Sequence, residues 1–271
     1  MKSFLRPSVF SSFVFLALGG GAFAANTPTL SSLTQNESDA IMKNFGNAVA
    51  FRSLEPPSSN GKIWGLGFGL VGQATSATHV NEALATHGTP QNIPALPAGD
   101  LVVSLQGPKG VSLELGFLPS KTISGFTVKR LAFNAKWTFT DVLLRKQTPF
   151  DAAFRFGYGR NEFAYNQVLS GVQDRVEFVS KALRLELAAS RKFLFLEPYL
   201  GLGMLRTSST LSNTASQALF NFTASETYDF SKSSFFVNLG TEILVIPFVL
   251  AGQVEWAFGE TTAALKIGFK F

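Results

Sequence analysis

The histidines are the first residues to test for chemistry, because an imidazole can act as a general base or a metal ligand near neutral pH. The chain has two, His79 and His87, in a polar stretch that we expect to form a loop. Their spacing fits no common zinc motif, and no third ligand lies at a suitable distance. His79 and Glu82 could imitate a base and its orienting carboxylate, but histidines are commonplace in loops. The sequence therefore predicts no enzyme, no metal and no cofactor.

Charged residues elsewhere alternate with apolar ones. In the last ten residues, Ala263, Leu265, Ile267 and Phe269 occupy every second position, and Lys266 lies between them. Successive side chains of a strand point to opposite faces, so one face of this segment is apolar and the other ionic. The charged side chains that we assign to such ionic faces comprise five acids and five bases: Glu114, Glu186, Glu197, Glu242, Glu255, Arg130, Lys136, Arg155, Arg184 and Lys266.

The same alternation continues along the chain and predicts about ten strands, with eight or twelve also acceptable. Their expected ranges are 62–74, 100–106, 111–118, 125–139, 150–160, 176–190, 194–206, 233–246, 248–258 and 262–271. An even number is what a closed antiparallel barrel requires when both ends of the chain lie on one side. We therefore expect an all-β, up-and-down antiparallel barrel.

Composition limits the class of protein. Of 271 residues, 46% are hydrophobic and 15% charged, yet no internal stretch approaches the roughly 18 to 20 apolar residues of a membrane-spanning helix. The net charge of +5 comes from dispersed lysines and arginines, which predicts no nucleic-acid partner. Attraction to anionic lipid headgroups or lipopolysaccharide is a more natural use of this charge. The absence of cysteine is compatible with many compartments.

The N-terminus has two further parts. Residues 1–24 combine Lys2 and Arg6, a short apolar run and a small-x-small site, which predicts a cleaved secretory signal peptide. Residues 25–60 contain apolar positions at helical spacing that end before Pro56-Pro57, which predicts a short amphipathic helix. This segment is expected to be a plug or a periplasmic latch, or only a tether packed against the barrel of residues 61–271.

The predicted connections alternate in length. Those on the side of the C-terminus are mostly short, and longer polar loops are expected at 75–99, 161–174 and 207–231 on the other side. This is the layout of outer-membrane barrels. Leu219, Phe220 and Phe222 lie within the third loop and suggest either a contact for apolar solutes or packing onto the barrel rim.

Alternation alone leaves two orientations open, because a soluble sandwich or lipocalin-like barrel buries its apolar face. The composition of the ionic face favours the opposite arrangement. This face carries many glycines, among them Gly67, Gly69, Gly201 and Gly203, which weaken a strand exposed to water but leave room for long neighbours in a narrow lumen. Trp64, Trp137, Tyr158 and Trp256 lie near strand ends, as in aromatic girdles.

The end of the chain resembles the C-terminal strand of bacterial outer-membrane β-barrel proteins. The matching positions are Leu265, Ile267, Phe269 and the terminal Phe271. The resemblance implies location in the cell outer membrane, contact with its lipid, and recognition of these four residues by the barrel-assembly machinery. It identifies a class of protein and no narrower family.

Ten strands place the barrel close to those whose lumen is filled by side chains. Five inward charges of each sign favour paired ions over a selective pore, although a narrow polar channel stays open as an alternative. The expected function is structural, or passive transport of small, including apolar, solutes. The other readings are a soluble periplasmic β-barrel that binds a ligand and an outer-membrane enzyme with a site at the rim.

Overall fold

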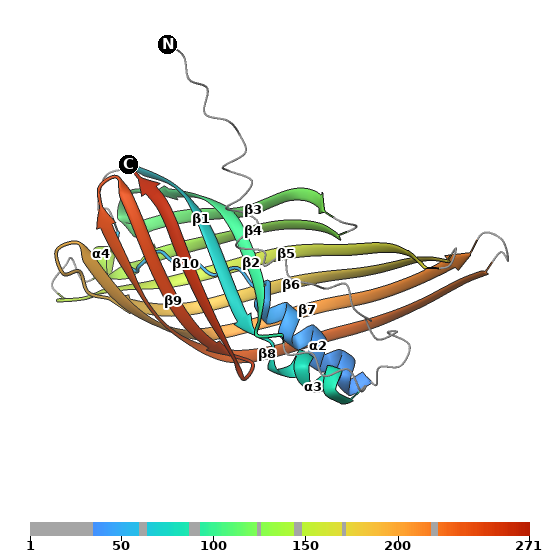
Figure 1. Cartoon of the computed structure of the whole chain (residues 1–271). Coiled ribbons are helices and arrows are strands. Elements are labelled where there is room, and N and C mark those ends of the chain that lie inside the picture. The colour runs from blue at the N-terminus through green and yellow to red at the C-terminus, as the bar shows by residue number, and fades with distance from the viewer. Residues whose placement is uncertain are drawn as a thin grey trace, which may run out of the picture.

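The computed structural model describes residues 35–59, 64–86, 93–123, 126–143, 148–169, 172–217 and 222–271. The predicted signal peptide and His87 lie outside these ranges. Ten antiparallel strands form a closed barrel in which each strand pairs with its neighbours in sequence and β1 pairs with β10 (Figure 1). The predicted all-β antiparallel barrel of about ten strands, with a short N-terminal helix, is confirmed.

The ten strands follow one another along the chain, and short helices lie in some of the connections between them. The strands are β1 (Gly65–Ser76), β2 (Ala95–Gln106), β3 (Val111–Ile123), β4 (Phe126–Thr138), β5 (Asp151–Leu169), β6 (Val172–Ser190), β7 (Leu196–Gln217), β8 (Phe222–Val245), β9 (Phe248–Ala257) and β10 (Glu260–Lys270). The helices are α2 (Gln35–Ala48), α3 (Thr78–Thr86), α4 (Phe139–Leu143) and the 3-10 turn η2 (Pro108–Gly110). None of the described helices is long and apolar enough to cross a membrane.

The apolar side chains of alternate positions face outward. Leu185 and Ile267 are 51% and 58% exposed on the outer surface, whereas their neighbours Arg184 and Lys266 are buried inside. Trp64 and Trp137 lie at the barrel end that carries the C-terminus, and Trp256 lies at the opposite end. A soluble barrel would bury the apolar set and expose the ionic one, so the observed arrangement is that of a barrel in lipid.

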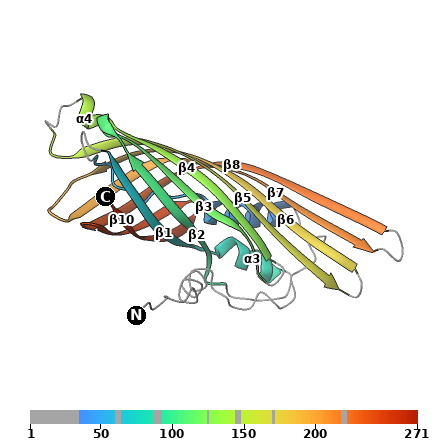
Figure 2. The ribbon, with the colours of Figure 1, turned by 90° about the horizontal axis from the view of Figure 1, so that it is seen from above.

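Strands β5 to β8 are much longer than the other six. They have 19, 19, 22 and 24 residues and run well past the rest of the barrel at the end opposite the C-terminus (Figures 1 and 2). We call this projecting part the wall. The predicted loops 161–174 and 207–231 were wrong, because nearly all of their residues belong to paired strands of the wall. The side chains of Leu219, Phe220 and Phe222 lie outside the described residues.

The N-terminal segment enters the barrel. Helix α2 lies against the inner face of the wall, where Met42 and Phe45 pack with Phe178, Leu211 and other apolar side chains. The chain then continues as an extended segment, residues 49–59, which we call the strap. Its central residues are buried inside the barrel.

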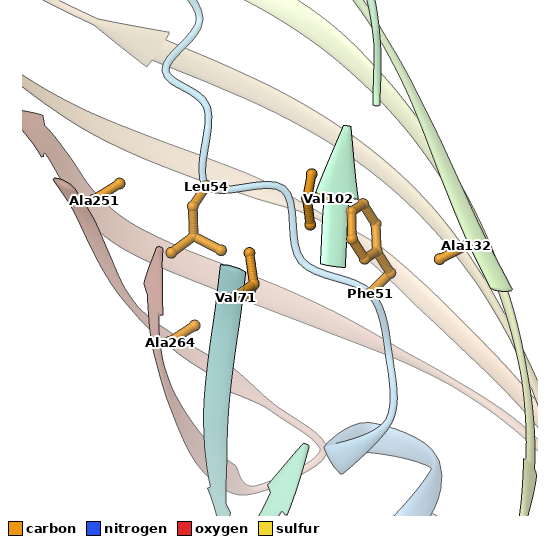
Figure 3. Close-up of a cluster of buried hydrophobic side chains, with 7 residues drawn as sticks. All are labelled: Phe51, Leu54, Val71, Val102, Ala132, Ala251 and Ala264. Atoms are coloured by element: carbon orange, nitrogen blue, oxygen red, sulfur yellow. The ribbon is translucent and has the colours of Figure 1, made fainter. Parts of the chain in front are cut away.

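The strap also contributes apolar contacts. Figure 3 shows Phe51 and Leu54 pointing to different sides of the strap, Leu54 toward β1 and β10 and Phe51 toward β2 and β4. The strap therefore forms the axis of the interior core, and the barrel strands surround it.

Candidate functional site

The interior of the barrel is the candidate site, because charged side chains and the strap meet there. Arg52 is the main anchor of the strap and is 1% exposed. Its Nε lies 3.0 Å from Glu255 Oε1, and Nη2 donates to Thr262 Oγ1 at 3.1 Å. Nη1 and Nη2 also bind the Asn47 carbonyl and side chain at 3.0 and 2.8 Å. One guanidinium thus fixes the turn after α2 and joins it to β9 and β10.

Inward side chains of the barrel bind the backbone carbonyls of the strap along its length. Near its start, Gln73 Nε2 donates to the carbonyls of Ala48 and Ala50 at 2.5 and 3.1 Å, and Asn161 Nδ2 to that of Val49 at 3.0 Å. Further along, the barrel donors are Arg155 to Glu55, Lys136 to Pro56 and Ser58, and Thr138 to Pro57. An extended chain with no strand partner needs such donors, because an unpaired buried carbonyl is costly.

A second cluster is centred on Glu186 of β6. Its Oε1 accepts from Arg155 Nη1 at 2.9 Å and Asn238 Nδ2 at 3.0 Å, and its Oε2 accepts from Arg184 Nε at 3.1 Å. Arg184 also reaches Glu255 Oε2 at 2.5 Å and lies over the Phe236 ring at 3.7 Å. Ions from three strands and the strap, together with the Asn238 amide, therefore share partners, which is how buried charges are tolerated.

Glu55 of the strap lies between two lysines of the barrel. Its carboxylate oxygens are 3.8 Å from Lys136 Nζ and 3.8 Å from Lys266 Nζ, and Lys266 also pairs with Glu114 at 3.1 Å. The strap thus supplies one acid and one base, Glu55 and Arg52, and each faces opposite charges of the barrel.

The remaining acids lie at the C-terminal end of the lumen. Glu242 pairs with Lys270 at 2.7 Å, and Glu197 accepts from Ser190 at 2.6 Å and Ser58 at 2.8 Å. A cavity of about 20 Å³ lies beside these groups, enough for about one water molecule.

The structure places all ten charged residues assigned from the sequence in the interior, each between 0% and 6% exposed. It adds Arg52, Glu55, Asp100 and Glu260, which the alternation analysis did not assign. Asp100 meets Arg130 at 3.0 Å across β2 and β4. Asp100 opens the predicted strand 100–106, where the alternation places it on the same face as Ser104 and Gln106, whereas nothing in the local pattern around Arg52 and Glu55 signals that they enter a barrel.

Glycines open space for these contacts. A methyl group on Gly116 would lie 2.5 Å from the Phe51 ring, and one on Gly201 would lie 2.7 Å from Asn238 Oδ1. Both distances are shorter than real contacts of that kind, so a side chain here would displace the strap or the Glu186 cluster. Gly116 therefore leaves the space that Phe51 of the strap occupies, and Gly201 leaves space for the Glu186 cluster.

His79 contributes to the contact between α2 and α3. Its Nε2 lies 2.9 Å from Lys43 Nζ and its Nδ1 3.2 Å from Glu82 Oε2, while its backbone N–H lies 3.4 Å from Glu260 Oε1. No group of three His, Asp or Glu among the described residues could hold a metal ion. The absence of enzymatic activity stays a prediction.

The last strand closes the barrel. Phe271 and Leu66 exchange two backbone hydrogen bonds, at 2.8 and 3.0 Å, and Phe269 packs on Phe248 with ring centroids 5.2 Å apart. The four residues of the predicted assembly signal, Leu265, Ile267, Phe269 and Phe271, all project outward. Their recognition by assembly machinery stays a prediction.

Solved structures with a similar arrangement are bacterial outer-membrane barrels. The N-terminal β-barrel domain of Pseudomonas aeruginosa OprF matches at 11% identity and TM-score 0.31, covering 76% of this chain and 97% of that one. The translocator domain of the autotransporter NalP from Neisseria meningitidis matches at 7% and 0.43, covering 78% and 89%. The outer-membrane protease OmpT of Escherichia coli matches at 9% and 0.39, covering 81% and 99%. Likenesses this weak carry no argument about activity.

No curated protein sequence matches the chain. A family model described as a family of unknown function, DUF6588, matches residues 22–271, nearly the whole chain. The chain therefore belongs to the DUF6588 family, and its closed ten-stranded barrel with an apolar outer face has the fold of outer-membrane β-barrels.

Proposed function

We propose that the protein resides in the outer membrane and has a structural role, with a lumen closed by its own strap. The observation that carries the proposal is the set of barrel donors bound to carbonyls at both ends of the strap, Val49 and Ala50 at one end and Glu55 to Ser58 at the other. A permanently open pore needs a free lumen, and here most of the ten charged residues serve as partners of the strap or of one another, while Arg130 pairs with Asp100 and Glu242 with Lys270.

The C-terminal end of the barrel is then periplasmic, and the wall projects outside the cell. Strands of about 9 to 11 residues suffice to cross a bilayer, so β8, with 24 residues, extends far beyond it. The resemblance of the terminal strand supports the same orientation. Helix α2 is consequently extracellular, and the strap passes from outside toward the periplasm.

Single-channel recording in planar bilayers tests the closed lumen. We expect the folded wild-type protein to be silent, and a variant lacking residues 35–59 to conduct. Because that variant leaves buried charges without partners, Arg52→Gln offers a milder change that should produce brief openings while preserving heat-modifiable migration on gels. Steady conductance by the wild-type protein with its strap in place would contradict the proposal.

Passive transport of small solutes is the second candidate function. It is favoured by the way the strap is held, through exchangeable hydrogen bonds and ion pairs around only two large apolar anchors, Phe51 and Leu54. Transport would require the strap to move aside. Liposome swelling with neutral solutes separates the two functions, since uptake by the wild-type protein at rates above those of empty liposomes supports transport.

A further inference from the structure

A row of basic side chains follows the outer surface where the wall begins. On β4 to β7, the first outward residue beyond the apolar surface is in each case a lysine or arginine. We call these residues the basic belt: Lys129, Arg160, Lys181 and Arg206. They follow Leu131, Tyr158, Leu183 and Met204, each of which is at least 38% exposed, and on β6 the half-buried Val179 lies beyond Lys181.

The register brings these cations together. Arg160 lies directly opposite Lys181, and Arg206 pairs with Leu183, one outward position from Lys181. Like charges opposite each other on one face of a sheet destabilise it. Lys129 and Arg160 share Glu162, at 3.8 and 2.9 Å, whereas no carboxylate of the described residues forms an ion pair with Lys181 or Arg206.

Inside the barrel, in contrast, cations are paired with carboxylates. Each of Arg52, Arg155, Arg184 and Lys266 has a carboxylate within 3.1 Å. The chain therefore neutralises these cations inside the barrel, whereas Lys181 and Arg206 of the belt are left for an anion from outside.

A hollow of about 460 Å³ lies on the wall immediately above the belt. Arg160 and Lys181 form its basic edge, and outward hydroxyl groups line much of the rest: Ser208, Thr210 and Ser231. Asp229, its one acidic residue, accepts from the Thr210 hydroxyl at 2.8 Å. Cations beside hydroxyl groups suit a phosphate attached to a sugar, because guanidinium and ammonium groups bind the phosphate and hydroxyls exchange hydrogen bonds with the sugar.

We propose that the basic belt and this hollow bind the phosphorylated sugar headgroup of an outer-leaflet glycolipid, with Arg160, Lys181 and Arg206 contacting phosphate. The adjoining apolar surface of Leu183 and Met204 would receive the acyl chains. The inference rests on the proposed outer-membrane location and orientation and is independent of whether the lumen is open.

Binding of purified full-length protein in detergent to bisphosphorylated lipid A tests the proposal at physiological ionic strength. The test variant is Arg160→Gln/Lys181→Gln/Arg206→Gln. The matched control, Lys109→Gln/Arg191→Gln/Lys192→Gln, removes three exposed cations at the other end of the barrel. Heat-modifiable migration on gels verifies that each variant is folded.

We expect the test variant to lose at least about tenfold in affinity and the control less than about twofold, since each charge-assisted contact to phosphate is strong. Dephosphorylated lipid A should bind the wild-type protein as weakly as lipid A binds the test variant. Equal losses in the two triple variants would overturn the site, because net charge alone would then explain binding. Complete competition by micromolar inorganic phosphate would overturn the assignment to a lipid headgroup.

Discussion

The two halves of strands β5 to β8 have opposite polarity. In the half that belongs to the barrel, Leu185 and Leu239 face outward while Glu186 and Asn238 face the lumen. In the wall, Lys181 and Ser231 face outward, and the inner face carries apolar side chains that pack against α2: Phe163, Phe178, Leu211 and Phe230. The same four strands are thus built for lipid in one half and for water in the other.

With the proposed outer-membrane location, we expect the point of inversion to lie at the edge of the bilayer. It lies between Tyr158 and Arg160 on β5, and between Leu183 and Lys181 on β6. Below it, lipid solvates the outer apolar surface, so the lumen can hold ions that pair with one another. Above it, water solvates the outer surface and the hydrophobic effect requires a buried apolar core, which α2 completes. Secondary structure continues across the boundary, and only the solvent changes.

The largest expected effect comes from breaking the ionic interior. Glu255→Gln leaves Arg52 and Arg184 without one of their carboxylates, which should lower the free energy of unfolding by about 3–5 kcal/mol. The matched change in the wall, Glu162→Gln, removes a half-exposed partner of Arg160 and should cost less than about 1 kcal/mol. Denaturant unfolding in detergent, followed by tryptophan fluorescence, measures both. Similar costs would show that burial in the lumen does not distinguish the two carboxylates.

A charge placed on the outer face tests where the boundary between lipid and water lies. On β8, Leu239→Arg puts a cation into lipid and should cost about 2–4 kcal/mol. Ser231→Arg, eight residues earlier on the same face of the same strand, remains in water and should change stability by less than about 0.5 kcal/mol. Unfolding from lipid vesicles provides the measurement. A cost at Ser231 as large as that at Leu239 would place the bilayer over the wall.

The smallest expected effect comes from single cysteine substitutions, which report the side of the membrane on which α2 lies and should leave stability unchanged. The chain has no cysteine, so Gln35→Cys, in the exposed first turn of α2, provides a single reactive thiol. We expect a membrane-impermeant maleimide to label it on intact cells. Lys109→Cys, in η2 at the opposite end, should react only after the outer membrane is permeabilised. Labelling of Lys109→Cys alone on intact cells would reverse the proposed orientation.

Much of the barrel could be predicted from local pattern because each strand meets two different environments. Alternation of residues such as Leu185 and Glu186 carries that information within a few positions, as does the apolar period of the terminal strand. The same pattern did not predict the strands of the wall. Its outward residues are Ser, Thr and charged residues, as in the stretch Arg206–Thr210, so the pattern there was that of a polar loop.

The sequence by itself determined the strand alternation, the ten charged residues of the ionic face and the resemblance at Phe271, because all are local properties of neighbouring residues. The tertiary structure decided that residues 49–59 fill the lumen, that Arg52 pairs with Glu255, and that Arg160, Lys181 and Arg206 lie side by side. Those contacts join residues from distant parts of the chain. Only closure of the barrel and the register of its strands bring them within reach of one another.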